Sequence, residues 1–184
     1  MNDSRSCSRT RKARVATPRY RSRFSTAMHA TGQPARALKA LARYAVTVEG
    51  ALATTAVQTV IDETTHTVTY SRAGHPPPLL LDADKHAVKV LDQASDSPLG
   101  ALEPEAARTQ STLSYQPGAT LVLYTDGLIE RRDQDIDTGL GRLIQNLTRH
   151  GHLGPEPLAD ALLTNLPPQK DGPDDDIVLV VVQL

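Results

Sequence analysis

Acidic residues stand at the ends of two of the most apolar stretches of the chain. The stretch LVLYTDGLIE (121–130) is apolar until it reaches Asp126, whereas DDDIVLVVV (174–182) begins with three acids and continues as an apolar run. If these runs are antiparallel neighbours in one sheet, the end of the first lies beside the start of the second. The carboxylates would then converge at one edge, where they repel one another unless a cation neutralises them.

The residue types at these ends suit a hard divalent cation. Oxygen ligands without Cys or clustered His favour Mg²⁺ or Mn²⁺ over Zn²⁺. Gly127, directly after Asp126, can adopt an unusual backbone angle and leaves the approach to the carboxylate open. Asp is also common at turns and strand starts, because it favours turns and stays solvated. On spacing alone, a turn role and a metal site both remain open.

A second candidate segment, AGHPPP (73–78), contains His75. The histidine could be a metal ligand, an acid/base group or a turn residue that caps the backbone. The three prolines that follow fix the backbone and remove donors, which favours the turn role. Neither Cys7 nor any Ser has a recognisable base beside it, and the sequence has no glycine-rich phosphate loop of the Walker or dinucleotide type.

The rest of the chain predicts an α+β layered domain, since mostly antiparallel strands have helices set between them. Apolar residues at helical spacing predict one helix between Pro34 and Gly50, a second that ends near Gly151 and a third that ends at Pro167. Three antiparallel hairpins are predicted, from 56–61 with 67–71, from 79–81 with 88–91, and from 111–115 with 120–124. The turn of the third hairpin is expected at Pro117-Gly118. A polar loop is expected over 92–109 and a last strand over 177–182.

Composition limits the classes of protein that the chain can represent. Its 184 residues, 39% of them hydrophobic, are enough for one domain with a core. The longest uninterrupted apolar run covers only 177–182, far short of the roughly 20 residues that a bilayer requires, so no membrane partner is expected. The single Cys7 excludes an internal disulfide. Cytoplasmic localisation is therefore expected.

The charges of the chain are distributed unevenly. Residues 1–43 carry 11 Lys or Arg and one acid, whereas 44–184 carry 9 Lys or Arg and 20 acids. We expect residues 1–33 to be a basic Arg/Ser-rich tail that is disordered, because this composition cannot bury a core. Such a tail could bind nucleic acid in a salt-sensitive way. With aromatic residues at 3% there is no stacking platform, so nucleic-acid binding is the weakest function class.

Five motifs occur in the chain in the following order: AGHPPPL (73–79), SPLG (97–100), QPG (116–118), LYTDG (123–127) with Glu130, and DDI (175–177). Together they resemble the C-terminal two-thirds of bacterial PPM-type (protein phosphatase 2C-like) metal-dependent serine/threonine phosphatases of the stage II sporulation protein E type. The resemblance runs from about Pro34 to Leu184. It implies an antiparallel β-sandwich flanked by helices, and hydrolysis of phosphoserine or phosphothreonine with two Mn²⁺ or Mg²⁺ ions that activate a water.

The resemblance also implies the site residues and the partner. Asp126 matches the metal-ligating Asp of the family's Tyr-Thr-Asp-Gly motif. Asp175 matches the ligand of its closing segment, with Asp176 as the one-residue alternative. No catalytic residue beyond the metal ligands is implied, and the phosphoprotein partner would be a regulatory protein, typically an anti-sigma-factor antagonist. Structural residues near the site are expected at Gly74, His75 and Gly127.

One motif of the family has no counterpart in this sequence. The Asp-Val-x-Gly-x-Gly segment that supplies the bridging Asp should precede Pro34, but residues 1–33 contain only Asp3 among the acids. We therefore expect 34–184 to be a partial phosphatase domain, incomplete at the N-terminus, with a poorly held second metal. Little or no phosphatase activity and marginal stability are expected. The alternative function is a non-catalytic phosphatase-like remnant that binds a phosphoprotein partner.

Overall fold

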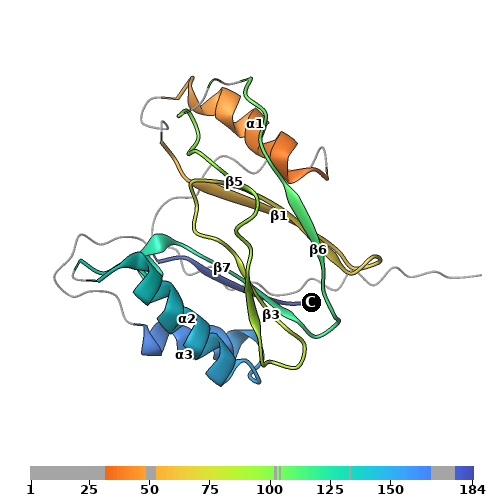
Figure 1. The fold of residues 1–184 in the computed structure, drawn as a ribbon, viewed down its shortest axis with the longest axis vertical. Helices are drawn as coiled ribbons and strands as arrows, with labels where there is room; N and C mark the ends of the chain where they lie inside the picture. Colours follow the sequence, from red (N-terminus) through yellow and green to blue (C-terminus); the bar gives the residue numbers. More distant parts are fainter. Residues whose placement is uncertain (1–31, 49–52, 102, 104, 133, 167–176) are drawn as a thin grey trace, which may run out of the picture.

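Two sheets pack face to face between helices in the computed structural model, which describes residues 32–48, 53–101, 103, 105–132, 134–166 and 177–184. Figure 1 shows α1 (Pro34–Ala45) on one side of the sheets and α2 (Ile136–His150) with α3 (Pro155–Asn165) on the other. The expected α+β sandwich with flanking helices is confirmed, as are the three predicted helices. None of the helices in the described part of the chain has the length and apolar character needed to cross a membrane.

The first sheet is built around β2 (Thr67–Ala73). This strand is antiparallel to β1 (Ala56–Asp62) in the predicted hairpin, with Ala56 opposite Ala73, and antiparallel to β6 (Ser111–Ser114) on its other side. It also pairs in parallel with β5 (Ser95–Asp96), so the prediction of a polar loop over 92–109 is wrong at this point. Backbone bonds from Arg72 and Gly74 to the carbonyls of Ala94 and Asp96 hold the short strand in place.

The second sheet has the order β4-β3-β7-β8, and all of its pairs are antiparallel. The hairpin of β3 (Leu79–Leu81) and β4 (Val88–Val90) is confirmed. So is the expected pairing of the two apolar runs, because the end of β7 (Thr120–Tyr124) lies beside the start of β8 (Leu179–Gln183).

The predicted third hairpin is wrong. Both strands form, but β6 pairs with β2 in the first sheet, whereas β7 pairs with β3 and β8 in the second. The Pro117-Gly118 turn therefore carries the chain from one sheet to the other. Exposure explains the outcome: β7 is buried at four of its five residues and needs a neighbour on each side, whereas β6 alternates between half-buried and exposed residues, as suits an edge strand.

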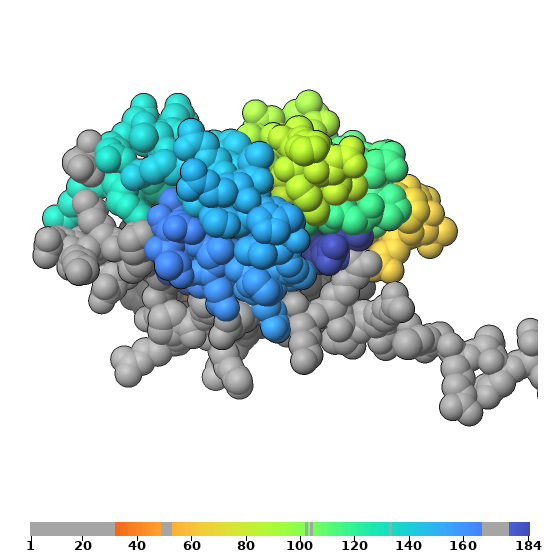
Figure 2. Space-filling model, turned by 90° about the horizontal axis from the view of Figure 1, so that it is seen from below, coloured from red at the N-terminus to blue at the C-terminus, as the bar shows by residue number. Residues whose placement is uncertain are grey.

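Three apolar layers hold these elements together. Leu121 faces the first sheet within the core between the sheets, and its neighbour Val122 faces α2 and α3. A smaller core packs Leu38 of α1 against Ala73 on the outer face of the first sheet. Burial of one such leucine or valine contributes about 1.5–3 kcal/mol. Figure 2 shows α2 and α3 (blue) covering the second sheet beside the yellow-green β3–β4 hairpin.

Candidate metal site at the ends of β7 and β8

Asp126 lies where β7 ends, and it opens the short turn η2 (Asp126–Leu128). The preceding Thr125 donates its N–H to the carbonyl of Val178 at 3.0 Å, and its Oγ1 accepts from the Val178 N–H at 2.9 Å. These bonds hold the chain that enters β8 against the end of β7. Asp175 and Asp176 lie outside the described residues, so their ligand role stays a prediction.

The carboxylate of Asp126 is half-buried and largely uncommitted, meaning that it accepts a single hydrogen bond from the described residues. Its Oδ1 accepts the N–H of Gly127 at 3.0 Å, and among the described residues the side chain has no second hydrogen-bond donor. An ionised carboxylate has about four lone-pair sites, so most of its accepting capacity remains. This geometry leaves the group able to bind a cation at the edge of the sandwich.

Gly74 joins two of the sequence motifs by close packing. Its N–H donates to the carbonyl of Asp96 at 2.8 Å, and its φ of +67° lies in the left-handed region that favours glycine. A Cβ added at Gly74 would come within 2.6 Å of Pro98 Cγ. The AGHPPP and SPLG segments therefore contact each other only because this residue has no side chain.

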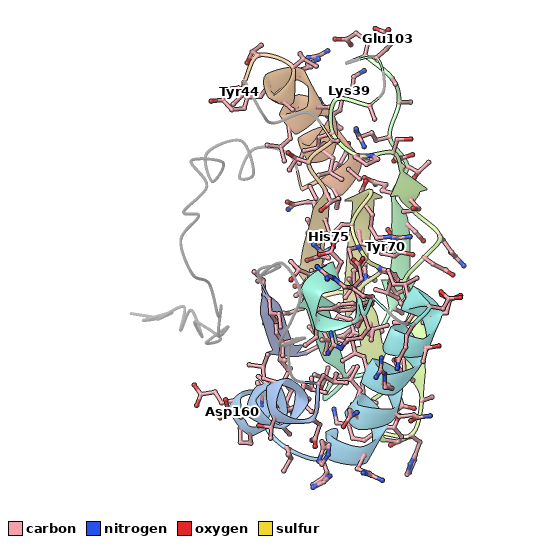
Figure 3. The ribbon with its side chains drawn as sticks, turned by 90° about the vertical axis from the view of Figure 1, so that its left-hand side faces the viewer. Lys39, Tyr44, Tyr70, His75, Glu103 and Asp160 are labelled. Carbon is pink, nitrogen blue, oxygen red and sulfur yellow. The ribbon has the colours of Figure 1, made fainter. Side chains whose placement is uncertain are left out.

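His75 lies at the same edge as Asp126, although the two residues come from different sheets. Burial lowers the pKa of His75 below its ordinary 6.5, although the Pro76 carbonyl and Asp126 raise it; Arg72 lowers it further. The ring Nδ1 lies 3.1 Å from the Pro76 carbonyl, which agrees with a turn role. Figure 3 shows His75 in the middle of the molecule, near Tyr70 and between the helical layers.

Two buried polar residues at this edge escaped the sequence analysis. Arg72, 8% exposed, donates to the carbonyls of His75 and Asp92, but its Nε has no partner. The hydroxyl of Tyr124 is also buried without a partner, and burial raises its pKa. The available signal was strand alternation, since Arg72 continues the inward-facing series of Val68 and Tyr70.

Asp126 offers carboxylate oxygen, which is the type of ligand that Mg²⁺ and Mn²⁺ prefer. Within the described ranges, no group of three or more His, Cys, Asp or Glu could hold a metal ion by itself. A metal site at this edge therefore depends on further ligands, for which the sequence nominates Asp175 and Asp176.

Two facing sheets between helices, antiparallel except for the β2–β5 pair, match the fold of PP2C-like phosphatase domains. The chain belongs to the family of stage II sporulation protein E (SpoIIE), whose family model matches residues 12–184.

Individual relatives agree with this family. The chain is 31% identical over 130 residues to the phosphoserine phosphatase RsbP of Bacillus subtilis, a match that covers 69% of the chain and 30% of RsbP. It is 30% identical over 128 residues to protein IcfG of Synechocystis, covering 67% of the chain and 19% of IcfG. The chain thus spans less than a third of either relative. The structure of the RsbU and RsbW domains of Rv1364c from Mycobacterium tuberculosis is 28% identical with a TM-score of 0.70, covering 81% of this chain and 41% of that one.

Proposed function

We propose that this chain is a metal-dependent phosphatase domain that hydrolyses phosphoserine or phosphothreonine monoesters on a regulatory protein. The observation that carries the proposal is the uncommitted carboxylate of Asp126, held at the end of β7 beside the chain that enters β8. The acids of 174–176 directly precede that chain. Membership of a phosphatase family supports the same reaction.

Asp126, with Asp175 or Asp176, would hold Mn²⁺ or Mg²⁺ at this edge. When bound, the ions supply charge neutralisation for the phosphoryl oxygens and lower the pKa of a water nucleophile. The protein itself holds the candidate ligands in position. The bonds between Thr125 and Val178 keep the two strand ends together, and burial lowers the pKa of His75 at the same edge.

The proposed protein substrate is a phosphorylated regulator of the anti-sigma-factor antagonist type. One similarity supports this class: a solved relative, 28% identical to this chain, joins RsbU and RsbW domains in one protein.

Hydrolysis of p-nitrophenyl phosphate by the purified chain, with and without Mn²⁺, tests the proposal. We expect slow hydrolysis that requires Mn²⁺ and that falls at least about 100-fold in Asp126→Asn, since even residues that only orient a metal ligand are worth 10–100-fold. Asp84→Asn, which changes an exposed acid in the β3–β4 turn, is the matched control and should keep the wild-type rate. Metal-independent hydrolysis, or equal rates in both variants, would contradict the proposal.

A non-catalytic, phosphoprotein-binding remnant is the second candidate function. Within the described residues, Asp126 belongs to no group of three or more His, Cys, Asp or Glu that could hold a metal ion, and this favours it. A folded chain that binds Mn²⁺ through Asp126 and captures a phosphorylated antagonist, but does not hydrolyse it, would select this candidate over the first.

A further inference from the structure

Arg72 is a buried cation without an acidic partner. Its guanidinium forms no ion pair with the described residues, and its side chain points into the space between the sheets with Val68 and Tyr70. Burial lowers the pKa of Arg72, while Tyr70, Asp92 and Tyr124 raise it, and a guanidinium stays protonated at neutral pH. A buried charge without a counter-charge is costly, so its retention calls for an explanation.

The guanidinium holds two separate loops through their main-chain carbonyls. Nη1 donates to the His75 carbonyl at 2.7 Å, and Nη2 donates to the Asp92 carbonyl at 3.3 Å. Residues 74–78 carry the chain from β2 in the first sheet to β3 in the second, where Leu79 pairs with Val122 of β7. Arg72 therefore holds the crossover between the sheets at the point where it passes the end of β7.

The crossover segment also approaches Asp126. Because β3 is antiparallel to β7 and Leu79 lies opposite Val122, the residues just before Leu79 run toward Asp126 at the end of β7. A shift of the His75 carbonyl would move the imidazole relative to Asp126. Arg72 can thus affect the edge without touching a metal or a substrate.

We propose that Arg72 is a positioning residue that ties the His75 and Asp92 carbonyls together and thereby fixes residues 74–78 against Asp126. The inference rests on the proposed metal role of Asp126. The Gly127 N–H, which donates to Asp126 Oδ1, reports on this carboxylate independently of activity.

The test combines the ¹H–¹⁵N spectrum of the full chain with Mn²⁺ binding followed by electron paramagnetic resonance. Arg72→Met should shift the Gly127 amide resonance and weaken Mn²⁺ binding by about 10-fold or more, in the range of residues that orient metal ligands. Arg72→Lys, which keeps the charge but not the two-armed geometry, should show an intermediate loss. Arg142→Met is the matched control, because Arg142 also has a buried Nε without a partner but lies on α2 and holds neither carbonyl.

The outcomes separate this inference from the proposed function. An unchanged Gly127 resonance and unchanged Mn²⁺ affinity in Arg72→Met, or equal changes in Arg142→Met, would overturn the positioning role. If Arg72→Met does not fold, a folded Arg72→Lys with wild-type Mn²⁺ affinity overturns it instead. If the wild-type chain binds no Mn²⁺, the proposed function fails, and the Gly127 shift alone then supports or overturns the role of Arg72.

Discussion

Both ends of the β-sandwich place an acid and a cation beside a strand end, but the two pairs are bonded differently. One end, the Lys85 end, comprises the turns at 62–66, 82–87 and 115–119, and lies on the right in Figure 1 with the C-terminus. The opposite end, the Asp126 end, comprises the crossover 74–78, η2 and the chain entering β8.

At the Lys85 end the charged groups are committed to the backbone. Asp82 accepts the N–H groups of His86 and Ala87 at 2.8 and 3.1 Å, which shapes the β3–β4 turn. Lys85 Nζ donates to the Gly118 carbonyl at 2.6 Å and to Thr120 Oγ1 at 2.9 Å, which ties that turn to the one before β7. The charged groups at this end therefore stabilise the two turns.

At the Asp126 end several polar groups have hydrogen-bonding positions that no described residue fills. Asp126 accepts one short-range hydrogen bond, whereas Arg72 Nε and the Tyr124 hydroxyl are buried without partners. Native proteins pair nearly all buried polar groups, so these two groups call for an explanation, such as a water, an ion or a catalytic role. The comparison teaches that an acid at a strand end is a ligand candidate only when the turn does not use its oxygens.

A groove of about 710 Å³ lies at the Lys85 end, lined among others by Asp82, Lys89, Tyr115 and Pro117. Of the two acids that line it, Asp82 already accepts backbone N–H groups and Asp84 is exposed in the β3–β4 turn. We therefore propose the Asp126 end as the site of the chemistry.

The sharpest way to break this comparison is to remove the acid charge at each end in turn. Asp126→Asn should weaken Mn²⁺ binding at least about 100-fold and leave the melting temperature close to wild type, because the turn hardly uses that carboxylate. Asp82→Asn should do the reverse, lowering the melting temperature and leaving Mn²⁺ affinity unchanged. Calorimetric Mn²⁺ titration and thermal unfolding measure both quantities, and similar profiles for the two variants would refute the distinction.

A stability effect confined to the Lys85 end would sharpen the comparison. Lys85→Met removes two hydrogen bonds from a charged donor, and we expect the free energy of unfolding to fall by about 1.5–3 kcal/mol. Urea unfolding gives this value, with Lys89→Met on the exposed side of β4 as the control, expected within about 0.5 kcal/mol of wild type. A loss of Mn²⁺ affinity in Lys85→Met would show that the two ends are coupled.

The smallest expected effect is a dependence of stability on acid pH at the Lys85 end. The Thr65 and Thr64 N–H groups hold the pKa of Asp62 below its ordinary 3.8. Because the unfolded chain then binds the proton more readily, this stabilisation is present above pH 3.8 and is lost as the pH falls through the lower folded pKa. Thermal unfolding across this range should show a shallower pH slope for Asp62→Asn, and an identical slope would rule out the contribution of Asp62.

Local sequence by itself determined the helices, most of the strands and the two acidic strand ends. Helical spacing of Leu38, Leu41 and Ala45 suffices because a helix closes its hydrogen bonds within one segment. The two tight hairpins were equally readable, since their partners are adjacent in sequence. The family motifs added Asp126 as the leading metal-ligand candidate.

Tertiary structure alone decided the partners of β5 and β6, the pairing of β7 with β3, and which polar groups remain free. The turn before β7 is a strong local signal, yet β7 pairs with β3 and β8 in the other sheet, where the first sheet covers one of its faces and α2 and α3 cover the other. Arg72 is one more basic residue in the sequence, and only the packing of the sheets buries it against the His75 carbonyl. The local sequence pattern predicts the hydrogen bonds that form within one segment. The burial of a side chain, and whether its polar atoms find partners, depend on segments that only the folded chain brings together.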